Sequence, residues 1–128
     1  MNTVQTLSAP LGRLLIALIF VISGVGKLGS YAGTQGYMES MGVPGVLLAP
    51  VIALEVLGGL AIILGLQTRL VAFLLAGFCI VSAVLFHGNV GDQMQQIQFL
   101  KNLGLAGGFL FLVAHGAGAW SLDNRRSA

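Results

Sequence analysis

Charged side chains are scarce in this chain of 128 residues, in which six Lys or Arg and four Asp or Glu make up 8% of the sequence. A soluble domain usually has about a quarter charged residues, so this chain has too few to cover a surface that faces water. Hydrophobic residues make up 56% of the sequence and form long, continuous runs. The composition predicts an integral membrane protein whose main partner is the lipid bilayer.

Several other signals are missing. No run of basic residues suggests nucleic-acid binding. The single cysteine, Cys79, excludes an internal disulfide or a dithiol redox pair. The two histidines, His87 and His115, fall at opposite ends of their apolar runs and are not expected to share a metal. Phosphate-binding loops, dinucleotide fingerprints and nucleophilic triads are also missing from the sequence. We therefore predict no metal site and no catalytic residues.

Four apolar runs approach or exceed the length of about 20 residues that a membrane-spanning helix needs. They cover roughly residues 9–28, 44–66, 70–87 and 97–120. No convincing cleavage site follows the first run, so we expect it to be retained as a span. The sequence predicts an all-α integral membrane protein, with one domain over residues 1–128 that forms a four-helix transmembrane bundle.

The orientation follows from the basic residues near the span ends. An even number of spans places both termini on the same side as the short turn before residue 70. That side carries four arginines and the other side two lysines: Arg13, Arg69, Arg125 and Arg126 against Lys27 and Lys101. The asymmetry predicts that both termini are cytoplasmic. We also expect the Arg13 side chain to extend to the membrane interface, as arginines near span ends do.

Glu55 is the most informative residue, because it is the only ionisable side chain between Glu39 and Arg69 and lies within an apolar run. A carboxylate at membrane depth is costly and usually faces other helices, where it finds a partner. Gly58 and Gly59 follow on the same helical face and let a neighbouring backbone approach. We expect Glu55 to lie inside the bundle, paired with a lysine.

Polar residues from the other spans fall at the same, outer end of the bundle. Lys27 ends the first span, His87 ends the third, and Lys101 and Asn102 begin the fourth together with Gln98. One carboxylate then faces two lysines, which leaves surplus positive charge if only one lysine pairs with it. The candidate ligand-binding residues are Lys27, Glu55, His87, Lys101 and Asn102. The alternative is a Glu–Lys pair that only fixes helix packing.

The loop over residues 29–43 is the longest hydrophilic segment. Thr34 could cap a short helix that places Tyr37, Met38 and Met41 on one side. The segment is either an interfacial anchor or a lid over a pocket.

Five segments together resemble the DoxX family of small bacterial inner-membrane proteins, and most closely its YqjF-like members. They are GRLLIALIFVISGVGKL, YAGTQGYMESMGVPG, LEVLGGLAIILGLQTR, LFH and QFLKNLGLAGG. The resemblance implies a multi-pass protein of the bacterial inner membrane. Some members of the family are subunits of quinone-linked oxidoreductases, and others are tied to thiol and oxidative-stress handling. The family supplies no settled role for the five candidate residues.

Three hypotheses for the function follow. The first is a membrane subunit of a quinone-linked oxidoreductase or redox system, with quinone as its cofactor and either a redox partner protein or a bound substrate as electron donor. Self-association into a homo-oligomer is left open. The second is a small transporter or efflux component for an aromatic or anionic metabolite. The third is a structural or assembly factor of the membrane.

Overall fold

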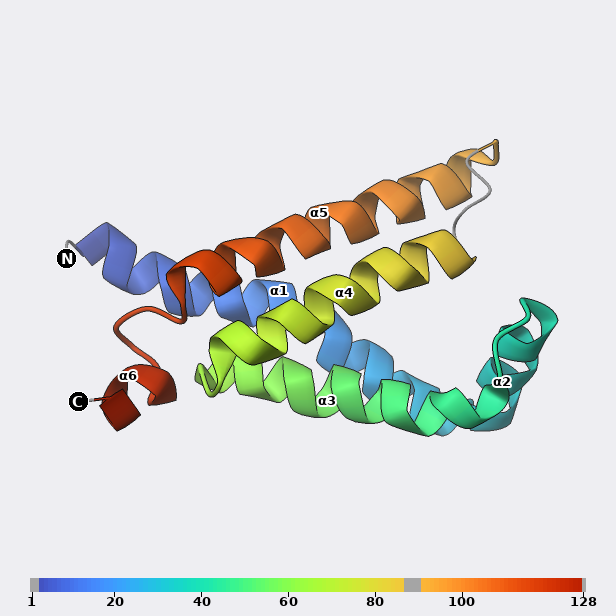
Figure 1. Ribbon diagram of the computed structural model, residues 1–128, viewed down its shortest axis with the longest axis horizontal. Helices are drawn as coiled ribbons and strands as arrows, with labels where there is room; N and C mark the ends of the chain where they lie inside the picture. The colour runs from blue at the N-terminus through green and yellow to red at the C-terminus, as the bar shows by residue number, and fades with distance from the viewer. Residues whose placement is uncertain (1–2, 87–90, 128) are drawn as a thin grey trace.

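A computed structural model of the chain describes residues 3–86 and 91–127, without the side chains of residues 5 and 125–127. The described residues form six α-helices and one 3-10 turn, with no strand among them. The helices are α1 (Thr3–Gly29), α2 (Tyr31–Ser40), α3 (Leu48–Leu64), α4 (Thr68–Phe86), α5 (Gln93–His115) and α6 (Leu122–Ser127), and the turn η1 (Gly45–Leu47) leads into α3. Figure 1 shows the four long helices side by side, with α2 at one end and α6 at the other.

Four helical segments are long and apolar enough to cross a membrane: Thr6–Gly29, Gly45–Leu64, Thr68–Phe86 and Gln93–His115. Large apolar side chains such as Leu15, Val46 and Phe111 lie exposed on their outer faces, as expected for surfaces in contact with lipid. The predicted all-α, four-helix transmembrane fold is therefore confirmed. Both chain ends lie at the α6 end of the bundle (Figure 1), and their cytoplasmic placement stays a prediction.

The bundle consists of two antiparallel helix pairs. The most extensive contacts join α1 to α3 and α4 to α5, and α3 also contacts α4. The pairs meet in a core where Phe20 of α1 packs edge-to-face against Phe109 of α5, with ring centroids 5.4 Å apart. Phe78 of α4 makes a similar contact with Phe20 at 6.5 Å. These aromatic contacts hold the pairs together near the middle of the bundle.

The fourth long helix is displaced from its predicted range, because α5 begins at Gln93 and ends at His115 rather than running over about residues 97–120. Asp92 caps its start by accepting a hydrogen bond from the Met94 N–H, so the polar residues before Phe99 belong to the helix. Gly116 has a φ of 75°, which ends the helix. The chain then turns into α6.

The predicted short helix in the outer loop exists as α2, but Thr34 does not cap it. Thr34 lies inside the helix, and its hydroxyl donates to the Ser30 carbonyl at 2.9 Å. Met38 is buried with Leu48 and Ile52, which fixes α2 against the start of α3. The helix therefore begins earlier than the capping signal indicated.

Arg13 is a second correction, because the sequence suggested that its side chain extends to the membrane interface. Instead the residue is 1% exposed. Its guanidinium donates to the carbonyls of Ile62 at 3.1 Å and Ile63 at 3.0 Å, and also to the Trp120 carbonyl. Arg13 thus ties α1 to the last turn of α3 and to the segment before α6.

Asp123 completes this end of the bundle. Its carboxylate accepts hydrogen bonds from the backbone N–H groups of Gln67 at 2.6 Å and Thr68 at 2.8 Å, at the start of α4. The Asp123 N–H in turn donates to the Gly65 carbonyl at 2.8 Å. A carboxylate at a helix N-terminus satisfies free N–H groups and suits the helix dipole. The C-terminal segment therefore closes the end of the bundle opposite α2.

Candidate functional site

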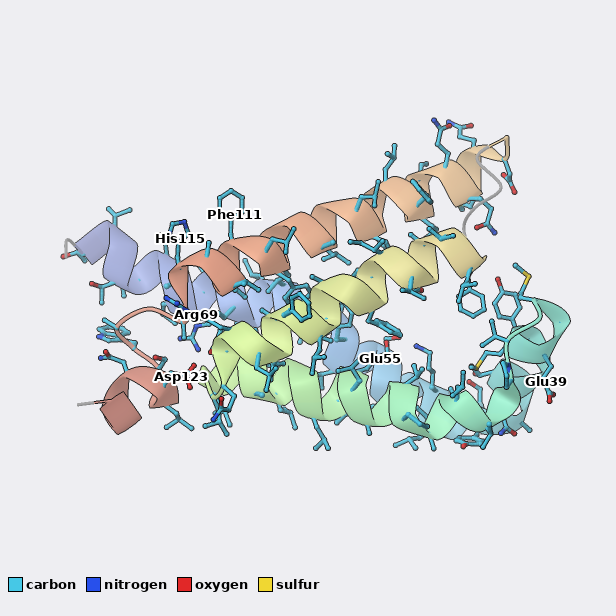
Figure 2. The ribbon with its side chains drawn as sticks, in the orientation of Figure 1. Glu39, Glu55, Arg69, Phe111, His115 and Asp123 are labelled. Carbon is cyan, nitrogen blue, oxygen red and sulfur yellow. The ribbon has the colours of Figure 1, made fainter. Side chains whose placement is uncertain are left out.

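The centre of the site is an ion pair between α1 and α3. Lys27 Nζ lies 2.6 Å from Glu55 Oε1 and donates a further hydrogen bond to Ser23 Oγ at 2.9 Å. The Glu55 side chain is 4% exposed and that of Lys27 is 26% exposed. Figure 2 shows Glu55 directed into the bundle rather than toward its outer surface. Of the two lysines that the sequence offered as partners, Lys27 is the one that pairs with Glu55.

Two glycines bring the helices close enough for this pair. A Cβ atom added at Gly24 would lie 2.5 Å from Val56 Cγ2 and 3.2 Å from the Glu55 Cβ atom. A Cβ atom at Gly59 would lie 2.7 Å from Val21 Cγ2. The predicted close approach beneath Glu55 is confirmed at Gly59. At Gly58, the second glycine of the prediction, an added Cβ atom would lie at ordinary van der Waals distances of 3.5–3.6 Å from its nearest neighbours, so the helices do not approach as closely there.

The ion pair forms part of the wall of a cavity of about 200 Å³. All four long helices contribute to this cavity. Its polar lining consists of Ser23, Lys27, Glu55, Ser82, Gln98, Lys101 and Asn102, and its apolar lining includes Phe20, Phe78 and Cys79. The described lining residues therefore carry one carboxylate and two lysines, which leaves a surplus positive charge.

A second chamber of about 200 Å³ adjoins the first and lies beneath α2. Lys27, Phe78 and Ser82 line both chambers, so the two chambers adjoin along these residues. The remaining lining of the second chamber is mostly apolar: Thr34, Tyr37, Met38, Leu48, Val51 and Phe86. The rings of Tyr37 and Phe86 stack at 5.6 Å, which links α2 to the end of α4. The site thus has a polar chamber and an apolar, aromatic chamber.

Four of the five candidate residues from the sequence lie around this site: Lys27, Glu55, Lys101 and Asn102. The fifth, His87, lies outside the described residues. Lys101 is an exposed residue at the rim, whereas Glu55 is buried. The helix that carries Lys101 packs closely at only one of two glycines that follow the lysine. Gly108 contacts Ile16, but nothing lies within 4 Å of a Cβ atom added at Gly104.

Sequence reasoning missed the contribution of α4. Phe78, Ser82 and Phe86 follow one another at four-residue steps and line the site. This spacing places the three side chains on one helical face, so the sequence alone could have shown that they face the same site. Cys79 of the same helix is 2% exposed and belongs to the core, and it also borders the polar chamber.

Comparisons with known proteins agree on the family. The DoxX family description matches residues 9–88. The chain is 46% identical over 123 residues to the inner membrane protein YqjF of Escherichia coli strain K12, and this alignment covers 96% of this chain and 95% of that protein. It is 39% identical over 122 residues to the inner membrane protein YphA of the same organism, covering 90% and 87% of the two chains.

A more distant relative is named "Putative oxidoreductase CatD" in Bacillus subtilis strain 168, with 32% identity over 76 residues, 59% of this chain and 57% of that protein. No solved structure matches the chain. The family match covers more than half of the chain, and the similarity to YqjF extends over almost all of it. The chain therefore belongs to the DoxX family and is a multi-pass protein of the bacterial inner membrane.

Proposed function

We propose that this protein is the quinone-binding membrane subunit of a quinone-linked oxidoreductase, with the quinone in the two-chamber site. The observation that supports the proposal is that a positively biased chamber lies next to an aromatic, apolar one, with three lining residues in common. A quinone has carbonyl oxygens on a flat ring and an apolar tail. Its polar and apolar parts match the two chambers, since small-molecule sites combine apolar walls with a few placed polar groups.

Each chamber has a role in this proposal. Lys101 and Asn102 supply hydrogen-bond donors that are suited to a quinone carbonyl oxygen. Negative charge develops on that oxygen during reduction, and a preorganised cation stabilises it. Lys27 is held by Glu55 and Ser23 and fixes the wall between the chambers. Tyr37, Phe78 and Phe86 offer ring faces to the apolar part of the ligand.

The electrons come from outside the quinone site. Reduction of a quinone to a quinol takes up two electrons and two protons, and a single cysteine offers no dithiol to supply them. A redox partner protein, or a reduced substrate bound to it, is the donor in this proposal. The name of the relative CatD supports an oxidoreductase role.

The test is quinone binding by the purified protein in lipid nanodiscs, with extraction and mass spectrometry of the quinone that co-purifies. Lys101→Met should weaken binding of a short-chain quinone by about tenfold, since a hydrogen bond from a charged group contributes about 1.5–3 kcal/mol. Asn102→Ala should weaken it by about fivefold, since a neutral hydrogen bond contributes about 1 kcal/mol. Gln96→Met is the matched control, because Gln96 is an exposed residue of α5 that does not line the site. Unchanged binding in both variants would contradict the proposal.

A second measurement separates quinone binding from transport. Proteoliposomes that contain the protein without a redox partner should show no flux of aromatic or anionic solutes. Flux that is lost in Lys101→Met, together with the absence of bound quinone, would assign the same site to transport instead.

A further inference from the structure

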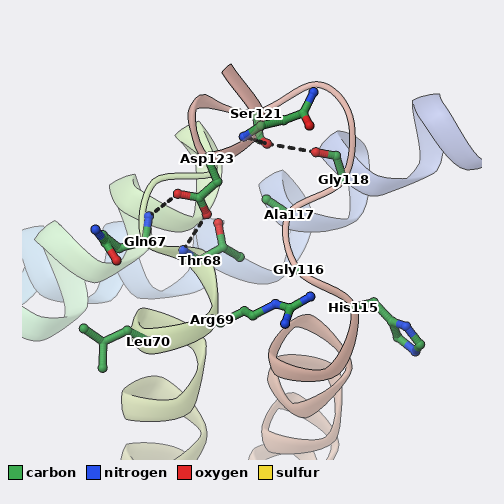
Figure 3. Close-up of a pocket in the computed structure, with 11 residues that line it drawn as sticks. Gln67, Thr68, Arg69, Leu70, His115, Gly116, Ala117, Gly118, Ser121 and Asp123 are labelled. Atoms are coloured by element: carbon green, nitrogen blue, oxygen red, sulfur yellow. Dashed lines mark hydrogen bonds between the residues drawn. The ribbon is translucent and has the colours of Figure 1, made fainter. Parts of the chain in front are cut away.

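A second pair of cavities lies at the α6 end of the bundle, opposite the end that α2 covers. One is a groove of about 340 Å³ along α1 and α5. The other, of about 410 Å³, lies where α4 begins, α5 ends and the chain turns into α6 (Figure 3). His115 and Gly116 line both cavities, so the groove and the second cavity adjoin at the end of α5.

The groove lies between two points of close contact. A Cβ atom added at Gly108 of α5 would lie 2.6 Å from Ile16 Cδ1 of α1. A Cβ atom at Gly118, beyond the end of α5, would lie 2.7 Å from the Ala9 Cβ atom. Between these contacts the two segments stand apart. A Cβ atom added at Gly12, which lines the groove, would meet nothing within 4 Å.

The walls of the groove are apolar where the helices cross the membrane. Ile16, Phe111 and Leu112 line it, and the Phe111 side chain is exposed on the outer face of α5 (Figure 2). Arg13 also lines the groove although it is 1% exposed. The two terminal nitrogens of Arg13 donate to backbone carbonyls, but its Nε–H has no hydrogen-bond partner among the described residues. A buried N–H without a partner is costly, so a polar group of a ligand would be favoured there.

The adjoining cavity is polar and contains Arg69, His115, Thr68 and Ser121. Figure 3 shows Arg69 directed toward the end of α5, where His115 and Gly116 lie. A Cβ atom at Gly116 would lie 3.3 Å from Arg69 Nε, so the guanidinium rests against the backbone there. Thr68 is fully buried, and its Oγ1 has no hydrogen-bond partner within the part of the chain that the structure describes. Each cavity therefore contains one buried polar atom without such a partner.

The charges around the two cavities favour an anion. Arg13 and Arg69 are positive, Asp123 is negative, and neutral His115 can donate one hydrogen bond. The described residues thus leave one positive charge, which equals the charge that a single phosphodiester would balance. The carboxyl end of α5 carries partial negative charge and opposes an anion. The guanidinium of Arg69 must therefore supply most of the attraction.

We propose that the two cavities together bind one anionic phospholipid, with its phosphodiester beside Arg69 and Thr68 and an acyl chain in the groove between α1 and α5. The apolar groove selects a lipid over a soluble phosphate. The surplus positive charge selects an anionic lipid over a zwitterionic one. This site is separate from the quinone site and does not depend on it.

The experiment measures lipid binding to the full-length protein in detergent by native mass spectrometry, with phosphatidylglycerol and phosphatidylcholine added at equal concentrations. Phosphatidylglycerol should bind more tightly and should raise the melting temperature. Arg69→Gln should weaken its binding by about fivefold or more and remove the preference, because one arginine near a membrane surface contributes about 1 kcal/mol. Arg69 lines neither chamber of the quinone site, so quinone binding should be unchanged.

Two glycine substitutions in α1 test whether the groove holds the acyl chain. Gly12→Leu would fill the groove without meeting protein atoms at its Cβ, and leucine favours a helix over glycine. Gly26→Leu is the matched control on the same helix, since a Cβ atom there also meets nothing within 4 Å and Gly26 lines neither cavity. Gly12→Leu should reduce phosphatidylglycerol binding to the level of Arg69→Gln, and Gly26→Leu should bind like the wild type.

Three outcomes would overturn the proposal. Equal binding of the two lipids by the wild type would indicate a nonspecific lipid shell. Equal binding by Gly12→Leu and Gly26→Leu would place the acyl chain elsewhere. Inorganic phosphate or glycerol phosphate that raises the melting temperature as much as the lipid does would show a site for a soluble anion.

Discussion

Among the residues that the structure describes, each end of the bundle buries one charged side chain, and the two ends use the charge differently. At the α6 end, Arg13 donates to the carbonyls of Ile62, Ile63 and Trp120. At the α2 end, Glu55 has one ion pair, with Lys27, and borders a cavity. Arg13 joins three segments, whereas Glu55 joins only α1 and α3.

This difference explains why one end is tied together and the other contains a site. The Arg13 contacts, together with Asp123, hold α1, α3, α4 and the C-terminal segment at fixed distances. The Lys27–Glu55 contact stays within one helix pair, so α4 and α5 can stand away from it. A charge whose partners are backbone carbonyls of several segments supports the fold. A charge beside a cavity remains accessible to a ligand.

The largest effect is expected for Arg13→Met. The substitution removes the hydrogen bonds to the Ile62, Ile63 and Trp120 carbonyls and frees the segment before α6. It should cost about 4.5 kcal/mol or more, since each of the three hydrogen bonds from a charged group contributes about 1.5–3 kcal/mol. Unfolding in detergent, followed by circular dichroism, measures the loss. Arg69→Met in delipidated detergent is the control and should change stability by less than about 0.5 kcal/mol, because Arg69 is exposed. Equal losses in the two variants would contradict a special role for Arg13.

A smaller loss is expected where α1 and α3 approach most closely. Gly59→Val would overpack the contact with Val21 and should cost about 1–3 kcal/mol. Gly58→Ala is the matched control on the same helix, because its added atom meets neighbours at 3.5 Å or more. The same unfolding measurement applies. If Gly58→Ala proved the more damaging change, the close packing of α1 on α3 would be wrong.

The ion pair should contribute less than the Arg13 contacts, because Lys27 is partly exposed and its partner borders a cavity. Glu55→Gln leaves Lys27 without a counter-charge, and Lys27→Met leaves Glu55 without one. We expect each to cost about 1–3 kcal/mol, the penalty for an unsatisfied buried polar group. The double variant should recover part of the loss, since it buries no unpaired charge. A double variant whose loss equals the sum of the single losses would show that the two side chains do not interact.

The sequence was informative where a residue was unusual for its surroundings. The position of Glu55 inside an apolar run predicted that its carboxylate would have a charged partner. The order of the spans alone placed three polar residues at the same end of the bundle: Lys27, Lys101 and Asn102. Arg13 was misjudged because an arginine near a span end normally extends to the interface. Its carbonyl partners lie 49, 50 and 107 residues away in the chain, and backbone carbonyls carry no residue-specific signal.

The apolar chamber could also not be predicted from the sequence. Phe78 and Phe86 resemble any other aromatic residues of a lipid-facing helix until the packing of α2 is known. The stack of Tyr37 on Phe86 depends on how α2 folds back over the bundle. Thr34 suggested a helix start within the loop, but burial of Met38 against Leu48 determined where α2 lies. Tertiary packing outweighed the local capping signal.

The smallest effect on stability, and the sharpest separation of the two lysines, is expected for Lys101→Met. Methionine has a similar length and removes the charge, and Lys101 is exposed at the rim, so the free energy of unfolding should stay within about 0.5 kcal/mol of the wild-type value. Binding of a short-chain quinone should nevertheless weaken by about tenfold, because the surplus cation is lost. Lys27→Met should show the reverse balance, with a lower melting temperature, because Glu55 loses its partner at 2.6 Å. The two variants are compared in the same nanodisc preparation, with melting temperature and quinone binding measured side by side.

A loss of stability in Lys101→Met equal to that in Lys27→Met would mean that both lysines compensate Glu55, and the site would then have no surplus charge for a ligand. Wild-type melting and wild-type binding in both variants would leave the polar chamber without a role, and the structural or assembly hypothesis would take its place.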